Sequence, residues 1–227
     1  MLQKPKLIYC ASGNRRFAQI AIDAGYLYGA QLPHTVYYPV YFADQDWKKP
    51  NKEGYMKALE KHRPHMATVL DWEKESQLSE VLSQACEVAQ FVKQVVIIPK
   101  VIGGVQAIPE TVNDKEVILG YSVPTRFGGT KVPIEEFNSR PVHLLGGQPH
   151  KQMEVFEKLE NVVSTDGNYA HLMAVKFCSF WVPGISSAGT GRWWEKLENI
   201  GKGKMKDGPY EAFRISCNNI KIAWEEV

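Results

Sequence analysis

Three aspartates and one lysine stand where short apolar runs of the sequence end, and these are the side chains that could do chemistry. Asp44 follows an aromatic run, Asp71 ends TVLD, Asp166 ends VVSTD, and Lys100 ends VVIIPK. A charge at the end of an apolar run is expensive to bury, so we expect these side chains to face a polar cleft or to be paired. Carboxylates in a cleft suit nucleophilic attack and proton transfer, and a lysine there suits Schiff-base formation. The alternative for any single aspartate is to cap the helix that follows.

Glycine pairs recur after the same apolar runs. They are Gly103–Gly104, Gly128–Gly129 and Gly146–Gly147, and Asp166 is itself followed by a glycine. Glycine permits a tight turn and a close approach of the backbone to a ligand, so these pairs suit a planar or phosphorylated ligand. Turns use glycine for other reasons too, so the pairs alone are weak evidence for a site.

Eight β-rich runs alternate with helical patterns along most of the chain, and several are continuously apolar, as in strands covered on both faces. The expected strands are Lys6–Ser12, Tyr26–Leu32, Tyr38–Asp44, Met66–Asp71, Val95–Lys100, Val117–Ser122, Pro141–Gly146 and Asn161–Asp166. The expected helices are Arg15–Ala24, Lys52–His62, Glu73–Val92, Pro133–Asn138, Pro149–Glu160 and Asn168–Phe180.

This alternation predicts an α/β fold, a TIM-like (β/α)8 barrel, because right-handed crossovers between parallel strands allow few other closures. An open, doubly wound sheet is the alternative. We expect residues 1–180 to form the barrel and residues 181–227 a short C-terminal extension packed on it. In both folds the carboxyl ends of the strands form the active face. The strand-end residues Ser12, Gln31 and Ser122 would then join the aspartates and Lys100 there.

The composition indicates a soluble protein of the cytoplasm. The 227 residues suit one barrel-sized domain, the net charge is +2, and no apolar run is long enough for a signal peptide or a membrane span. The four cysteines are far apart and the six histidines do not form HExxH. We therefore expect no metal site and no cofactor, and we interpret His143, inside a strand, as a core residue.

The order of the strand-end motifs resembles that of the tRNA-guanine transglycosylase superfamily, and in particular its phage branch, which places deazaguanine bases in DNA. The most specific part is RPVHLLGGQPHKQ, from Arg140 to Gln152, followed by a strand ending at Asp166. In that family a similar run precedes the strand that ends in the nucleophilic aspartate. Three further family motifs have weaker counterparts in this sequence, in the same order along the chain: YFADQDW, TVLDWE and IIPKVIGG. The resemblance covers roughly residues 6 to 170.

The resemblance implies base exchange on a guanine nucleotide in DNA or tRNA, with guanine or a deazaguanine as the free base. Asp166 would be the nucleophile and Asp44 or Asp46 the acid/base. The implied substrate-binding residues are Asp71, Lys100, Gly103, Gly104, Gly146, Gly147 and Asn168. The tRNA enzymes of the family carry a zinc site of closely spaced cysteines after the nucleophile, whereas this chain has only Cys178 and Cys217 there. That departure favours DNA over tRNA as the polymer. The resemblance to the phage branch implies the host cytoplasm as the location if the chain is of phage origin.

Two other functions fit the same barrel. One is a lyase or aldolase acting on a small phosphorylated substrate, with Lys100 as a Schiff-base amine. The other is a nucleic-acid-binding barrel without chemistry, which would show steeply salt-dependent binding. Arg126 and the tail lysines Lys202, Lys204 and Lys206 could hold phosphates, or could simply be solvated.

Overall fold

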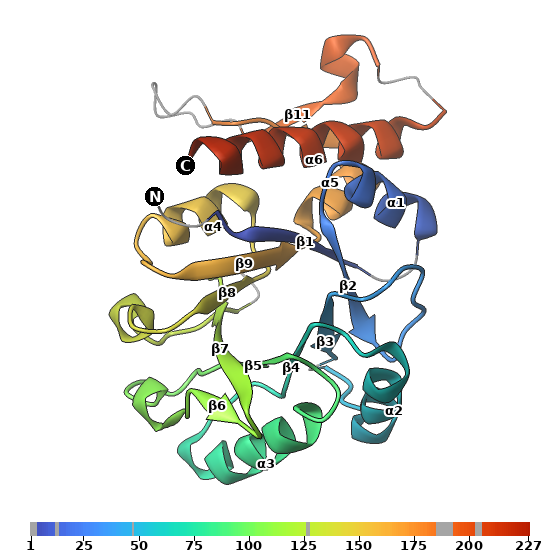
Figure 1. Ribbon diagram of the computed structural model, residues 1–227. Coiled ribbons are helices and arrows are strands. Elements are labelled where there is room, and N and C mark those ends of the chain that lie inside the picture. Colours follow the sequence, from blue (N-terminus) through green and yellow to red (C-terminus); the bar gives the residue numbers. More distant parts are fainter. Residues whose placement is uncertain (1–3, 12–13, 47, 126–127, 185–192, 203–205) are drawn as a thin grey trace.

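The protein is an α/β barrel in a computed structural model that describes residues 4–11, 14–46, 48–125, 128–184, 193–202 and 206–227. Eight parallel strands surround the barrel axis and helices lie outside them (Figure 1). The barrel strands are β1 (Lys6–Cys10), β2 (Leu27–Leu32), β3 (Phe42–Gln45), β4 (Met66–Thr68), β5 (Gln94–Ile97), β7 (Lys115–Ser122), β8 (Val142–Leu145) and β9 (Val162–Gly167).

The sheet closes on itself, which confirms the barrel over the open sheet. Each strand pairs in parallel with its sequence neighbours, β5 with β7 and β1 with β9 included. In the last of these pairs Ile8 lies opposite Asp166. All eight expected strands are present, because each was long and apolar enough to be covered on both faces. The segment between Lys100 and Val117, longer than a barrel connection needs, contains η2 (Val105–Ala107) and β6 (Thr111–Val112), which pairs antiparallel with β7.

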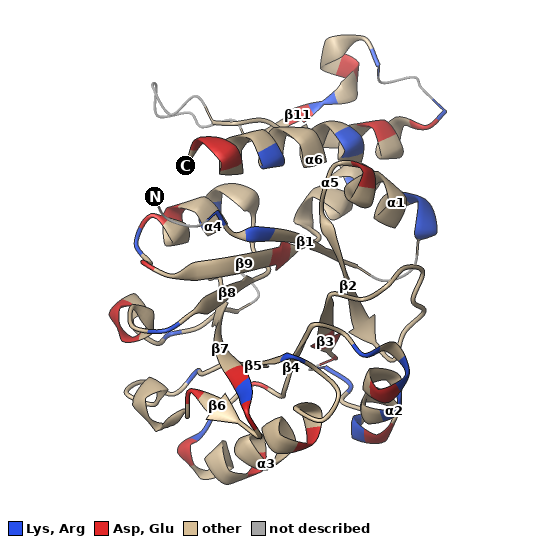
Figure 2. Cartoon of the chain, viewed as in Figure 1, with Lys and Arg blue, Asp and Glu red and all other residues tan. Residues whose placement is uncertain are grey.

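Two layers of apolar side chains hold the barrel together. Alternate strand residues point inward, so that Phe42 packs inside the barrel while its neighbour Ala43 packs outward against the helices. Charged positions gather on the helices and loops, and most strand positions are uncharged (Figure 2). The inner cluster consists of Ile8, Cys10, Phe42, Met66, Val96, Ile98 and Ile118.

Asparagine side chains cap the first two helices, and the later helices differ in extent from the prediction. The side chain of Asn14 accepts hydrogen bonds from the first turn of α1 (Arg15–Asp23), and Asn51 does the same for α2 (Lys52–His62). The Glu73–Val92 prediction becomes η1 (Glu75–Gln77) and α3 (Leu78–Val88), and Pro133–Asn138 becomes the 3-10 turn η3 (Ile134–Phe137). The other two predicted helices are α4 (Pro149–Phe156) and α5 (Tyr169–Phe177), each shorter than predicted.

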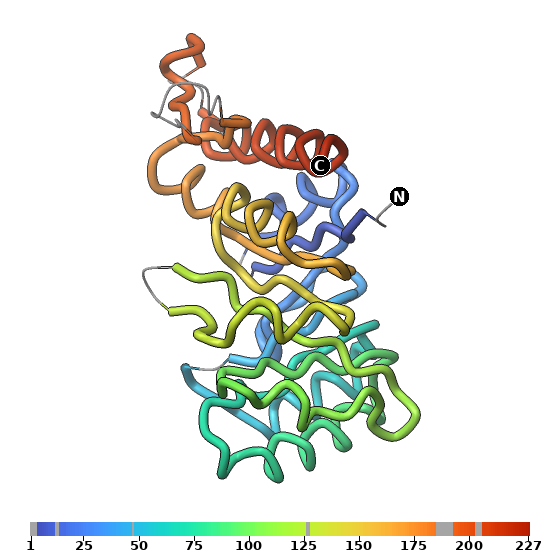
Figure 3. Tube along the Cα trace, turned by 90° about the vertical axis from the view of Figure 1, so that its left-hand side faces the viewer, coloured from blue at the N-terminus to red at the C-terminus, as the bar shows by residue number. Residues whose placement is uncertain are grey.

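The C-terminal segment covers the outer face of the first and last barrel strands. It contains β10 (Ser179–Trp181), β11 (Trp194–Lys196), η5 (Leu197–Ile200) and the long helix α6 (Gly208–Glu226). α6 lies across one end of the molecule in both views, next to α1 and α5 (Figures 1 and 3). Phe213 on α6 packs on Tyr9 of β1 at 5.2 Å between ring centroids. None of the helices in the described part of the chain combines the length and apolar character needed to cross a bilayer.

Candidate functional site

A cavity of about 580 Å³ opens at the carboxyl ends of the barrel strands. It lies where the closed sheet brings together residues that are far apart in the sequence, from Cys10 to Asn168. Asp71, Lys100, Gly146, Gly147 and Asn168 also line it. Every barrel strand contributes one residue at or next to its end: Cys10, Gln31, Asp44, Thr68, Ile98, Ser122, Leu145 and Asp166.

Asp166 is held at the cavity wall by contacts from β8 and the loop after it. The backbone N–H of Gly146 donates to its Oδ1 at 3.2 Å, and Nε2 of His143 lies 3.3 Å from the same oxygen. The side chain of Gln152 donates to the backbone oxygens of Gly146 and Asp166, at 2.7 and 2.6 Å. The Gly146 and His143 contacts converge on Oδ1 of the carboxylate, and Gln152 holds the backbone around it. In the described residues no hydrogen bond reaches its other oxygen, Oδ2.

The two glycines after β8 give this loop its shape. Gly146 and Gly147 have φ values of +62° and +85°, a region that side chains rarely adopt. A Cβ on Gly147 would also lie 2.6 Å from Cγ1 of Val123, too close for any side chain. Glycine therefore relieves backbone strain at both positions, and at Gly147 it also avoids a clash with Val123.

Asp44, the next-to-last residue of β3, also lines the cavity and has an environment that favours its neutral form. Burial, followed by the negative charges of Asp166 and Asp71, raises the pKa of Asp44 from 3.8 to about 8. A hydrogen bond from the Thr68 hydroxyl, at 3.3 Å from Oδ1, opposes the rise. At neutral pH this carboxyl therefore keeps its proton, and the cavity contains an acid close to two further carboxyl groups.

Asp71 and Lys100 form an ion pair in the cavity wall. The Lys100 ammonium contacts Oδ2 of Asp71, and the two side chains are 23% and 19% exposed, for the lysine and the aspartate respectively. An acceptor and a donor are thus presented side by side to any ligand in the cavity. Such a pair recognises a planar molecule that carries a donor next to an acceptor.

Three of the predicted site residues do not line the cavity. Asp46 lies beyond the end of β3, and its Oδ1 accepts hydrogen bonds from the backbone N–H groups of Lys48 and Lys49. Gly103 donates its N–H to the Glu136 carboxylate, at 2.9 and 3.1 Å. Gly104 packs on the Trp72 ring, which a Cβ would approach within 2.7 Å. Of the proposed acid/base residues, therefore, Asp44 and not Asp46 lies in the cavity.

The candidate phosphate-binding cations are placed differently from one another. Lys202 forms an ion pair with Glu211 of α6 at 2.9 Å, and Lys206 is exposed. Ser12, Arg126 and Lys204 lie outside the described residues. The structure thus assigns Lys202 an intramolecular partner.

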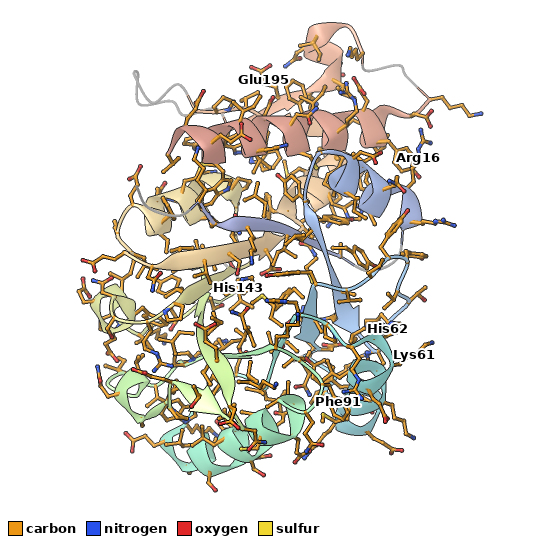
Figure 4. The ribbon with its side chains drawn as sticks, viewed as in Figure 1. Arg16, Lys61, His62, Phe91, His143 and Glu195 are labelled. Atoms are coloured by element: carbon orange, nitrogen blue, oxygen red, sulfur yellow. The ribbon has the colours of Figure 1, made fainter. Side chains whose placement is uncertain are left out.

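Several residues that the sequence did not single out belong to the site. Thr68 contacts Asp44, Gln152 fixes the Gly146 loop, and His143 contacts Asp166. His143, labelled in Figure 4, is fully buried, as expected of a core residue, but its Nε2 lies 3.3 Å from Oδ1 of Asp166. The sequence contains a pattern that places His143 at the site. His143 and Leu145 alternate with outward-facing residues of β8, so both point to the inside of the barrel, where the strand ends form the cavity. Within the described ranges no group of three or more His, Cys, Asp or Glu residues is arranged to hold a metal ion.

Comparison with known proteins supports the fold and gives a family. Among solved structures, the YdjI aldolase from Escherichia coli K12 is similar with a TM-score of 0.52 and 11% identity, over 98% of this chain and 90% of that chain. At that identity the likeness concerns the barrel fold alone. No curated protein is significantly similar in sequence. A family model described as "Family of unknown function (DUF6610)" matches residues 21–225, a range that includes Asp44, Asp71, Lys100 and Asp166.

Proposed function

The chain belongs to the DUF6610 family, and we propose that it is a guanine transglycosylase that exchanges guanine in DNA, rather than in tRNA, for a deazaguanine base. The observation that carries this proposal is the pairing of two carboxyl groups with different environments across one cavity. Asp166 has one oxygen held by the Gly146 N–H and the other without a hydrogen bond among the described residues, as a nucleophile requires. Asp44 has a pKa of about 8 and holds a proton, as a general acid requires.

The exchange is a double displacement at the sugar C1′. Asp166 attacks C1′ as the bond from C1′ to the guanine nitrogen breaks, and the departing base takes the proton of Asp44. The enzyme then carries a glycosyl ester on Asp166, and Asp44 is a carboxylate. The incoming base gives its N–H proton to Asp44 and attacks C1′, which releases Asp166. Two inversions retain the anomeric configuration, as in retaining glycosidases.

The Asp71–Lys100 pair matches the edge of guanine. Guanine carries two neighbouring N–H donors followed by the O6 acceptor. The Asp71 carboxylate accepts from the donors, and the Lys100 ammonium donates to O6. Adenine presents an amino donor where guanine has O6, so the Lys100 ammonium would face another donor. A DNA base must leave the stack to reach this cavity, whose size lies within the usual range for small-molecule sites.

The direct test is the incorporation of radiolabelled guanine into DNA and, separately, into tRNA. We expect label in DNA, and we expect Asp166→Ala to abolish it while the circular dichroism spectrum and unfolding midpoint stay close to those of the wild type. Asp46→Ala is the matched control, because that carboxylate lies outside the cavity. Denaturing mass spectrometry should detect, on the wild-type chain, a covalently bound DNA oligonucleotide that lacks one guanine base, and no such adduct on Asp166→Ala. Full exchange by Asp166→Ala would remove the nucleophile assignment, and label in tRNA alone would correct the polymer.

A second candidate function is a Schiff-base lyase or aldolase, favoured by the position of Lys100 in the cavity. The similar solved barrel is, by its title, an aldolase. Against it, the Lys100 amine is engaged by Asp71, whereas imine formation needs a free amine. Borohydride reduction in the presence of carbonyl substrates decides between the two. A stable adduct on the wild type that is absent from Lys100→Met supports the lyase, and no adduct across a broad panel counts against it.

A further inference from the structure

We propose that His143 is a positioning residue for Asp166, which it orients through an Nε2–H group whose tautomer is set by Ser164. The inference rests on the proposed function, since it gives Asp166 the role of nucleophile. It concerns a side chain that is 0% exposed and cannot itself touch a substrate.

The barrel register brings the three side chains together. His143 on β8 lies opposite Ser164 on β9, and Asp166 follows two residues later on the same face of β9. Nδ1 of His143 lies 2.8 Å from the Ser164 hydroxyl oxygen, and Nε2 lies 3.3 Å from Oδ1 of Asp166. Phe42 packs on the imidazole at 4.6 Å between ring centroids and helps to hold it in place.

The tautomer follows from what each ring nitrogen faces. A neutral imidazole carries one N–H, and its other nitrogen is an acceptor. The Ser164 hydroxyl is able to donate or accept, whereas Oδ1 of an ionised Asp166 only accepts. A proton on Nδ1 would set the Nε2 lone pair against the carboxylate. A proton on Nε2 lets the Ser164 hydroxyl donate to Nδ1 and makes Nε2 a donor that faces the Asp166 carboxylate.

The buried Nε2 atom has no aligned hydrogen bond to any described residue, which leaves it available to Asp166. An unpaired buried donor costs about 1–3 kcal/mol, so a small rotation of the carboxylate toward Nε2 is favourable. Catalytic hydrogen bonds are often long in unliganded proteins and shorten when substrate binds.

The contact gives Asp166 a fixed orientation during the reaction. Nε2–H and the Gly146 N–H both act on Oδ1, so Oδ2 is the oxygen that bonds to C1′. In the glycosyl ester Oδ1 is the carbonyl oxygen, and the same donors polarise that carbonyl and stabilise the carboxylate as it departs. His143 gains and loses no proton in either step.

Three substitutions at one position separate this role from simple packing. Glutamine places an amide N–H near the position of Nε2, asparagine reaches only the position of Nδ1, and leucine supplies neither. We expect His143→Leu and His143→Asn to lower kcat for guanine exchange by roughly 10- to 100-fold, with KM for guanine unchanged, because a hydrogen bond to a charged group is lost. His143→Gln should recover most of the rate. His65→Leu, at a histidine that stacks on Tyr41 and does not line the cavity, is the control.

Equal rates for the glutamine and asparagine variants, with equal unfolding midpoints, would overturn the proposal. A measurement without activity keeps the inference separate from the proposed function. Nitrogen-15 NMR of histidine-labelled protein should show His143 as the Nε2–H tautomer, and Asp166→Asn should shift its Nε2 signal more than its Nδ1 signal. A wild-type His143 protonated on Nδ1 would refute the inference even if exchange occurs. The absence of exchange in a wild type with the expected NMR signature would instead remove the proposed function.

Discussion

Replacing Asp44 with asparagine should stabilise the protein at neutral pH, and by an amount that depends on pH. The pKa of Asp44 is raised from 3.8 to about 8 by burial and by the charges of Asp166 and Asp71. Between these two values the folded state binds a proton that the unfolded state has released, so the free energy of unfolding falls as pH rises. Each pH unit costs about 1.36 kcal/mol. The roughly three units from 3.8 to pH 7 therefore amount to about 4 kcal/mol.

Asparagine resembles the protonated carboxyl in size and does not ionise, so the free energy of unfolding of Asp44→Asn lacks this pH-dependent loss. The measurement is urea unfolding of both proteins from pH 5 to 9. The difference in unfolding free energy should grow by about 1.36 kcal/mol per unit up to about pH 8 and then level off. Titrating groups that are not coupled to Asp44 cancel in the difference, whereas Asp166 and Asp71 interact with it. Ser122→Ala, an uncharged change at the same cavity wall, should give a curve parallel to the wild type.

Parallel curves for Asp44→Asn and the wild type would refute the reasoning, because they would mean that Asp44 is ionised equally in the folded and unfolded states. A difference that shrinks as pH rises would contradict the sign of the effect. Either outcome would also remove the argument that Asp44 is the proton donor in the proposed exchange.

Three further predictions concern the same cavity. Wild-type exchange should fall as pH rises through about 8, since Asp44 then loses its proton; a rate that climbs there would exclude it as the acid. Lys100→Met should lower the free energy of unfolding by about 2 kcal/mol, because it leaves the partly exposed Asp71 carboxylate unpaired. In urea unfolding, the double variant with Asp71→Asn should recover most of that loss. Additive effects of the two substitutions would argue against the ion pair. Gly147→Ala should lower the free energy of unfolding by about 2–3 kcal/mol and Gly146→Ala by about 1 kcal/mol, because only the Cβ at position 147 meets Val123. Equal thermal unfolding midpoints for the two variants would contradict the clash.

The barrel was predictable because its signals are local. Runs such as Val95–Ile97 are too short for a helix and too apolar for an exposed strand, and parallel closure follows from the crossovers between them. Helix α6 was not predicted as a separate element. Its residues in the range 208–226 were assigned to an appended cover, and only the structure shows how they pack on β1.

The site was predictable only in part, because its details depend on where strands end and how they are staggered. Asp44 and Asp46 have the same strand parity, and what separates them is that β3 stops at Gln45 and leaves Asp46 to the next turn. The neighbour of His143 depends on the register of β8 against β9, which shifts between Val142 and His143. No periodicity within one strand encodes that shift. Gly104 looked like a ligand-binding glycine and is instead required by the Trp72 ring.

The packing of α6 on the first strand has a consequence for how the chain is made. The Tyr26 hydroxyl donates to the backbone oxygen of Cys217, 191 positions away, and the aromatic face of β1 is covered by Phe213. At synthesis rates of about 5–20 residues per second, that outer face stays uncovered for about 10–40 s after the first strand is made. During synthesis the outer apolar face of β1 is therefore exposed until α6 packs on it, and in that interval it is open to contact with other chains.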